Sequence, residues 1–189
     1  MTLFPQCETI RFNIERGDMK VKIHCKNFDT EFKMALYGMV EFTMAKLVPS
    51  KRLRDNVTID VHFRHHEAEG EAKLDDYTNI YRPRHFRVII DHHRLEKDSY
   101  SGRERCATEW AHEVLKTLGH ELVHVKDYLT GVLSWRKGVL LYRGINYNVE
   151  TLTEYYDLPY EIEAYGREKG LLISFLAFWK SISEEFDFS

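Results

Sequence analysis

The longest amphipathic segment of the sequence lies between Ser101 and Gly131, and it restricts the folds open to the chain. Its apolar residues recur at spacings of three and four, which places them on one face of an α-helix. Ser101 and Glu104 have the spacing of a capping box, and Gly131 suits the position just after a helix. We predict one long helix that buries a stripe made of Trp110, Val114, Leu118, Leu122, Val125 and Leu129.

Two histidines lie on this predicted helix, away from the apolar stripe. His120 and His124 are four residues apart, so their side chains project from one side of a helix and can offer two imidazole nitrogens to one cation. Glu121 is turned by about 100° from His120, where its carboxylate can accept a proton from metal-bound water without being a ligand. We expect the histidines to face an open cleft. The alternative is that the pattern arose by chance in an amphipathic helix.

A third metal ligand is expected from a later helix that begins with Pro159, a residue tolerated in the first turn of a helix. Glu161 and Glu163 both qualify by type, but on a helix they point about 200° apart, so only one can face the site. The inward face predicted for this helix consists of Leu158, Ile162, Tyr165 and Leu172. Glu161 lies at its margin and is our choice of ligand, and Glu163 is expected to be a solvated charge. The other interpretation of Glu161 is a first-turn glutamate favoured by the helix dipole.

Shorter patterns predict the remaining elements. Apolar and polar residues alternate at 10–14 and 19–25 around a tight turn, which predicts a hairpin. Asp29 or Thr30 can cap a helix that ends before Pro49. Strands are expected at 57–63 and 86–90, a polar loop at 67–76, and two short strands within 135–142.

Together these elements predict an α+β fold in one domain, residues 1–189. Residues 1–27 would form an N-terminal hairpin extension, and residues 28–189 a core with a mixed β-sheet and the two helices that carry the metal ligands. At 189 residues and 22.5 kDa, the chain can bury an ordinary core without disulfides.

The net charge and the cysteine content limit the kinds of binding partner and the cell compartment that we expect for this protein. The formal net charge is −3, so no broad positive field exists to bind phosphates, and nucleic acid is an unlikely partner. Three cysteines, Cys7, Cys25 and Cys106, are far apart and form no zinc-ribbon motif, which favours a reducing compartment. The sequence contains neither a secretory signal pattern nor an apolar run of the ~20 residues that cross a membrane. We expect a cytoplasmic protein with no membrane partner.

Three segments together resemble a known family. They are His120-Glu121-Leu122-Val123-His124, which has the pattern HExxH, then Trp135-Arg136-Lys137-Gly138, then Leu158-Pro159-Tyr160-Glu161-Ile162-Glu163-Ala164. In this order they resemble the gluzincin metallopeptidases, and most the minimal SprT-like and phage-type members, over about residues 29–170. The resemblance implies a small zincin-like fold, a Zn2+ cofactor held by His120, His124 and Glu161, and Glu121 as the catalytic base.

One further feature of the sequence agrees with the pattern of that family, and two features differ from it. In many such families the ligand glutamate stands three residues before an alanine, and Glu161 and Ala164 match that spacing. Several gluzincins have an aspartate four residues after the ligand glutamate, which orients a zinc histidine. This chain has Tyr165 there, so the histidine must be oriented differently. SprT-like proteases that cut DNA-protein crosslinks commonly add a zinc ribbon, and its absence from this sequence disfavours that activity.

The leading hypothesis is a small soluble metallopeptidase that hydrolyses peptide bonds in a peptide or protein substrate, with zinc polarising the scissile carbonyl. The strand at 86–90 can bind an extended substrate as an added strand. The alternative is a zinc-binding structural or interaction protein that keeps the zincin-like fold without turnover. Transition metals other than zinc also accept these ligands.

Two further sets of residues were weighed and given no functional role. Histidines at the ends of two predicted strands suggest a second metal site, but adjacent residues of a strand point to opposite faces, so surface roles are expected for His62, His65, His66, Asp91, His92 and His93. A tyrosine from the segment after the long helix can donate a hydrogen bond to an oxyanion. Ordinary packing is the commoner role of such residues, and none of Tyr142, Tyr147, Tyr155, Tyr156 and Tyr160 is assigned.

Overall fold

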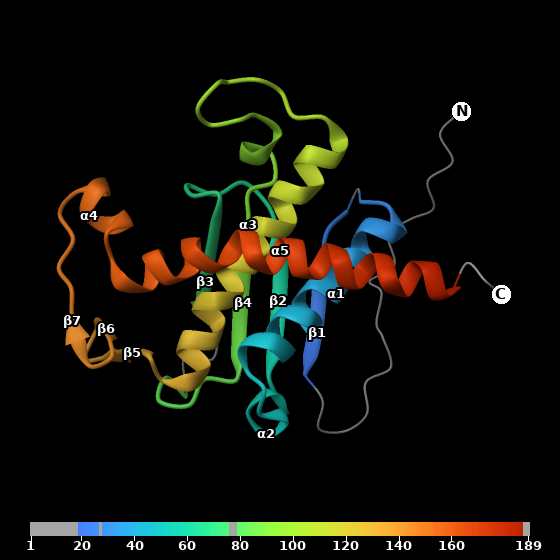
Figure 1. The fold of residues 1–189 in the computed structure, drawn as a ribbon. Helices are drawn as coiled ribbons and strands as arrows, with labels where there is room; N and C mark the ends of the chain where they lie inside the picture. Colours follow the sequence, from blue (N-terminus) through green and yellow to red (C-terminus); the bar gives the residue numbers. More distant parts are fainter. Residues whose placement is uncertain (1–18, 27, 76–78, 187–189) are drawn as a thin grey trace.

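The main β-sheet has four strands in the order β1-β2-β4-β3 in the computed structural model, which describes residues 19–26, 28–75 and 79–186 (Figure 1). The strands β1 (Lys20–His24), β2 (Thr58–Phe63) and β4 (His85–Ile90) are parallel. The fourth strand, β3 (Gly70–Leu74), pairs antiparallel with β4 at one edge. The sheet is therefore mixed, and with the helices it gives the predicted α+β class.

Three long helices form two layers on one face of this sheet. The helices α1 (Thr30–Leu47) and α3 (Ala107–Thr130) pack against the strands, and α5 (Pro159–Phe186) packs across α1 and α3, as the red helix of Figure 1 shows. Parallel strands need crossover connections, and α1 is the connection between β1 and β2. None of the helices in the described part of the chain has both the length and the apolar content to span a bilayer.

Short elements connect these layers. They are α2 (Lys51–Arg54), a 3-10 helix at Arg94–Glu96, the strands β5 (Leu133–Arg136), β6 (Val139–Tyr142) and β7 (Ile145–Asn146), and α4 (Leu152–Tyr156). The last four lie between α3 and α5 and form a small antiparallel sheet followed by a helical turn. This segment returns the chain from the end of α3 to the start of α5.

The core lies between the sheet and the layer of α1 and α3. Every second residue of β2 and β4 points into it, as expected from the alternation of side chains along a strand. The fully buried side chains include Leu36, Met39, Met44, Ile59, Phe86, Ile90, Leu118, Leu122 and Phe175. The apolar stripe predicted for α3 is confirmed, because its central members have no exposed surface and its end members, Trp110 and Leu129, are packed on the core.

Most of the predicted elements are confirmed. The helix α1 begins after Asp29, whose carboxylate accepts the N–H of Phe32 at 2.7 Å, and it ends before Pro49. The strands expected at 57–63 and 86–90 are β2 and β4, and the two short strands within 135–142 are β5 and β6. The helix expected at Pro159 is α5.

The prediction of a loop at 67–76 is wrong, because this stretch contains β3. Its central residues, Glu71, Ala72 and Lys73, are all of types depleted in strands. Pairing with β4 and packing on α3 hold the strand in place. Of the hairpin expected at 10–25, the second half is β1, which pairs in parallel with β2, and the first half lies outside the described residues.

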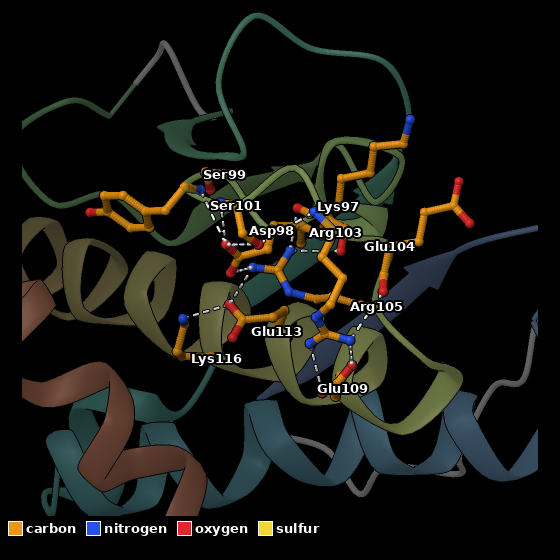
Figure 2. Close-up of polar contacts among 12 residues, drawn as sticks. Lys97, Asp98, Ser99, Ser101, Arg103, Glu104, Arg105, Glu109, Glu113 and Lys116 are labelled. Atoms are coloured by element: carbon orange, nitrogen blue, oxygen red, sulfur yellow. Dashed lines mark hydrogen bonds and ion pairs between the residues drawn. The ribbon is translucent and has the colours of Figure 1, made fainter.

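The long helix begins five residues later than the capping box of Ser101 and Glu104 suggested, because the polar groups of that segment have other partners (Figure 2). Ser101 donates its N–H and its hydroxyl to Asp98 Oδ1, at 2.8 and 2.9 Å. The helix starts after Cys106, whose N–H donates to Glu109 Oε2 at 3.0 Å. Gly131 ends it in the left-handed conformation, with φ of 77°, as predicted.

Arg105 ties the segment before α3 to the body of the protein (Figure 2). Its side chain is 10% exposed, and its guanidinium donates to the carbonyl oxygens of Leu95 at 3.0 Å and Lys97 at 2.6 Å. Arg103 differs, because it forms a two-point ion pair with Glu109 in which both side chains are exposed to solvent. The two arginines therefore offer a matched comparison.

We predict that Arg105→Met lowers the free energy of unfolding by about 1–3 kcal/mol, because two carbonyl groups lose their donor in a nearly dry site. Arg103→Met should change it little, since exposed ion pairs contribute little to stability. Urea unfolding of both variants beside the parent protein measures the difference. Equal losses in the two variants would show that Arg105 is not the anchor of this segment.

Candidate metal centre

The two histidines of α3 lie on the face of the helix that α5 covers. His120 is 7% exposed and His124 is 8% exposed, so the expectation of an open cleft around them is wrong. The reason is the path of α5, which packs across α3 at this level. The second half of α3 is buried on nearly all sides, because its apolar stripe packs on the core and α5 covers its other face.

Glu161, in the first turn of α5, meets both histidines. Its side chain is 3% exposed, and its oxygens lie 3.3 Å from His120 Nε2 and 3.5 Å from His124 Nε2. The two Nε2 atoms are 3.2 Å apart. Three donor atoms from two helices therefore converge on one point, and such groups can hold a metal ion.

The spacing of the two nitrogens and the two carboxylate oxygens is close to that of zinc ligands. Ligand atoms about 2.0–2.1 Å from a tetrahedral zinc ion lie roughly 3.3–3.4 Å from one another. The two Nε2 atoms are 3.2 Å apart, Oε2 of Glu161 is 3.3 Å from Nε2 of His120, and Oε1 of Glu161 is 3.5 Å from Nε2 of His124. Imidazole nitrogen and carboxylate oxygen are both common zinc ligands. The donor set therefore fits this ion in chemistry and in geometry.

The close approach of these groups also shifts the pKa values of His120 and Glu161. Burial acts to lower the pKa of His120, but hydrogen bonds to Glu161 and Glu168 outweigh it and raise that pKa to about 9. Burial acts to raise the pKa of Glu161, but bonds from His120 and His124 outweigh it and lower that pKa to about 2. Both shifts arise from the same contacts, in which a positively charged imidazole and a negatively charged carboxylate stabilise each other.

The inward face predicted for α5 is wrong in part. Ile162 is 56% exposed and Tyr165 is 44% exposed, whereas Glu161 lies at the centre of the buried face rather than at its margin. That face consists of Leu158, Glu161, Ala164, Leu171 and Phe175. The difference arises because the small Ala164 is fully buried on this face, whereas the larger Ile162 and Tyr165 lie toward solvent.

Glu163 points away from the histidines but is not the solvated charge that we expected. Its carboxylate accepts from Lys126 Nζ at 2.7 Å and from Arg167 Nε at 3.0 Å. Lys126 belongs to α3, so this ion pair is a second link between α3 and α5. The side chain of Glu163 is 21% exposed.

Glu121 lies beside the three donors without belonging to the group that they form. Its carboxyl group is buried, and burial raises its pKa to about 7. It packs against Gly70 at the start of β3, where a Cβ atom would lie 2.4 Å from Glu121 Oε1 and 2.9 Å from Thr117 Cγ2. A side chain at position 70 would overlap the carboxylate where it now lies, so one of the two would have to shift. No feature of the sequence pointed to this role of Gly70.

Aromatic side chains surround the histidines. The ring of Tyr165 lies 4.5 Å from that of His120, and the ring of Tyr160 lies 5.9 Å from that of His124. Tyr155 of α4 forms a side-chain hydrogen bond with Glu161. Burial and the negative charge of Glu161 raise the pKa of Tyr155, so its hydroxyl keeps its proton. Among the tyrosines left unassigned from the sequence, Tyr155 is the one bonded to a donor of the site.

The histidines at the strand ends have separate partners. Asp91 is 1% exposed and accepts the backbone N–H groups of His66 and His93, so it orders the loops that follow β2 and β4. The other donor groups found in the described residues both contain Asp60, one with His24 and His62 and one with Asp75 and His85. Asp60 already pairs with Lys22, at 3.3 Å, and with His85, at 2.9 Å. These groups form a charge network on the sheet face opposite α1 and α3.

We predict that Glu161→Ala weakens zinc binding by more than about 100-fold, beyond the 10–100-fold typical of groups outside the ligand set. Glu163→Ala, on the same helix, should leave zinc affinity unchanged, because its ion pairs point away from the histidines. Competition with a chromophoric chelator measures both constants. Equal losses would remove Glu161 from the ligand set.

We also predict that Gly70→Ala destabilises the protein by about 1–3 kcal/mol, because the added methyl group overlaps the buried carboxylate of Glu121. Gly170 is the matched control, since it is an exposed residue of α5 with no atom within 4 Å of an added Cβ. Gly170→Ala should stabilise by about 0.5–1 kcal/mol. Thermal unfolding compares the two variants, and a neutral Gly70→Ala would mean that Glu121 does not fill this space.

Comparisons of the chain with protein-family models, with curated proteins and with solved structures found no match. Support for a metal centre therefore comes from the molecule itself: two imidazoles on α3 and one carboxylate on α5 converge at distances that suit zinc. The structure brings together all four residues that the sequence placed in the site, His120, Glu121, His124 and Glu161.

Proposed function

We propose that this chain is a small zinc-dependent peptidase with a zincin-like fold, similar to the gluzincins. The observation that carries the proposal is the set of three protein donors with a buried glutamate beside them. Structural zinc sites use four protein ligands, whereas catalytic sites use three and keep one position for water or substrate. His120, His124 and Glu161 supply three donors, and Glu121 is adjacent to them but outside their group.

In the proposed reaction, a zinc ion bound by these three residues would polarise the scissile carbonyl and acidify a water molecule. Glu121 would accept a proton from that water and would pass it to the leaving amine. Its carboxyl group is buried and so lies out of bulk water, and Gly70 lets it lie close to β3. His120 and His124 would hold the ion through their Nε2 atoms, which lie 3.2 Å apart.

The substrate would bind along β3. The hypothesis that the strand at 86–90 accepts an added strand is wrong, because both edges of β4 are already paired, with β2 and with β3. β3 has one paired neighbour and lies at the edge of the sheet. An extended peptide added there would run past Gly70 and so past Glu121.

A surface hollow between β6, β7 and the start of α5 offers a place for a substrate side chain. Its lining includes Leu140, Tyr142, Asn146, Asn148 and Tyr160, so aromatic and polar groups both face it. The ring of Tyr160 also lies near that of His124, at 5.9 Å between ring centres, so the hollow lies next to the proposed metal ligands. This arrangement supports binding of a substrate side chain beside the cleaved bond.

The alternative function is a zinc-binding structural or interaction protein of the same fold. The low exposure of both histidines and of Glu121 favours it, because a site without access for substrate would hold the ion without turnover. In that case Glu121 would be a buried polar side chain and nothing more.

Glu121→Gln separates these functions. We predict that this variant keeps its zinc and its Tm while peptide cleavage falls about 10²–10⁴-fold, because an amide cannot accept the proton from water at neutral pH. Zinc content, Tm and cleavage of a peptide library are measured on the same preparations. Glu113→Gln, on the same helix and paired with Lys116 near the surface, is the control and should cleave as the parent does.

Cleavage that survives in zinc-loaded Glu121→Gln would remove the proposed mechanism. Stoichiometric zinc in the parent protein without any cleavage would instead support the structural or interaction protein.

A further inference from the structure

His120 of α3 lies between two carboxylates that both belong to α5. Its Nε2 atom is 3.3 Å from Glu161 Oε2, and its Nδ1 atom is 3.1 Å from Glu168 Oε2. Glu161 and Glu168 are separated by about two turns of α5, so they project from the same face of that helix. The imidazole is therefore held at both of its nitrogens, one on each side of the ring.

We infer that Glu168 is the residue that positions His120 for the metal. An imidazole can offer the Nε2 lone pair only when its proton is on Nδ1, and a carboxylate that accepts from Nδ1 selects this tautomer. The same contact fixes the rotation of the ring and strengthens Nε2 as a donor. The inference rests on the metal centre proposed above and adds a residue outside the ligand set.

The surroundings of Glu168 fit this role. Its side chain is 17% exposed and that of His120 is 9% exposed, so the hydrogen bond is largely shielded from water. Tyr165, the residue four positions after Glu161, contacts the ring of His120 edge to face and carries no carboxylate. Within the described residues, Nδ1 of the other histidine, His124, is buried without a partner. His120 is thus the histidine whose orientation is set by a charged group.

A plain salt bridge between α3 and α5 is the competing explanation, and Glu163 provides the control for it. Glu163 links the same two helices through Lys126 at 2.7 Å but does not touch either histidine. Loss of either contact loosens the helices, whereas only the loss of Glu168 should change the metal site.

The experiment measures zinc affinity by chelator competition, the visible spectrum of the cobalt-substituted protein, and Tm. Glu168→Ala should weaken zinc binding about 10–100-fold and shift the cobalt absorption bands, because the ring of His120 loses its fixed orientation. Glu168→Gln keeps an oxygen that can accept from Nδ1 but not the charge, so it should restore part of the affinity. Glu163→Ala should lower Tm with the affinity and the spectrum of the parent.

Three results would overturn the inference. The first is a Glu168→Ala variant with the affinity and cobalt spectrum of the parent. The second is an equal loss of affinity in Glu163→Ala, which would mean that any loosening of the helices acts on the site. If Glu168→Ala does not fold, Glu168→Met, which keeps the bulk of the side chain without an acceptor for Nδ1, is the deciding variant, and parent-like affinity and cobalt spectrum there are the third. A parent protein that binds no zinc would instead remove the metal centre itself.

Discussion

The packing of the helical layers depends on the electrostatic contact between the two histidines of α3 and Glu161 of α5. Burying an imidazole or a carboxylate costs several kcal/mol unless the group finds a partner. His120, His124 and Glu161 are all nearly removed from water, and each is the partner of the others. A shift of α5 by one residue would move Glu161 away from both histidines and leave its buried carboxylate without them. The register of the two helices is therefore set by this charge contact as well as by apolar packing.

The sheet supports this contact from the other side of α3. The apolar stripe of that helix is buried in the core on the side of β3 and β4, which fixes its rotation and turns the histidines toward α5. β3 covers the side of α3 from which Glu121 projects. Because Gly70 has no side chain, the carboxylate of Glu121 can lie close to this strand. Glu121 thus lies against β3, whereas Glu161 and Glu168 both pair with His120.

Local periodicity predicted the parts of the structure that local sequence controls. The stripe of α3, the cap of α1 at Asp29 and the strand β2 follow from the spacing and the capping chemistry of their own residues. β3 was missed because its residues have weak strand preferences and are held by β4 and α3. The predicted buried face of α5 is wrong in part because periodicity favoured large side chains, whereas the buried face contains the small Ala164. Glu168 needed the tertiary structure, since its partner His120 is far away in the sequence.

His120, His124 and Glu161 come from two segments that an unfolded chain does not hold together, so binding of the proposed ion would couple folding to the supply of that ion. A ligand that binds only the folded state stabilises it by about 2.7 kcal/mol when its free concentration is 100 times its dissociation constant. Typical domains have a total stability of only ~5–15 kcal/mol. Since α5 carries a carboxylate that the ion would neutralise, the docking of this helix becomes a function of the free zinc around the protein. The lifetime of the chain, as well as its chemistry, would then follow the zinc concentration of its compartment.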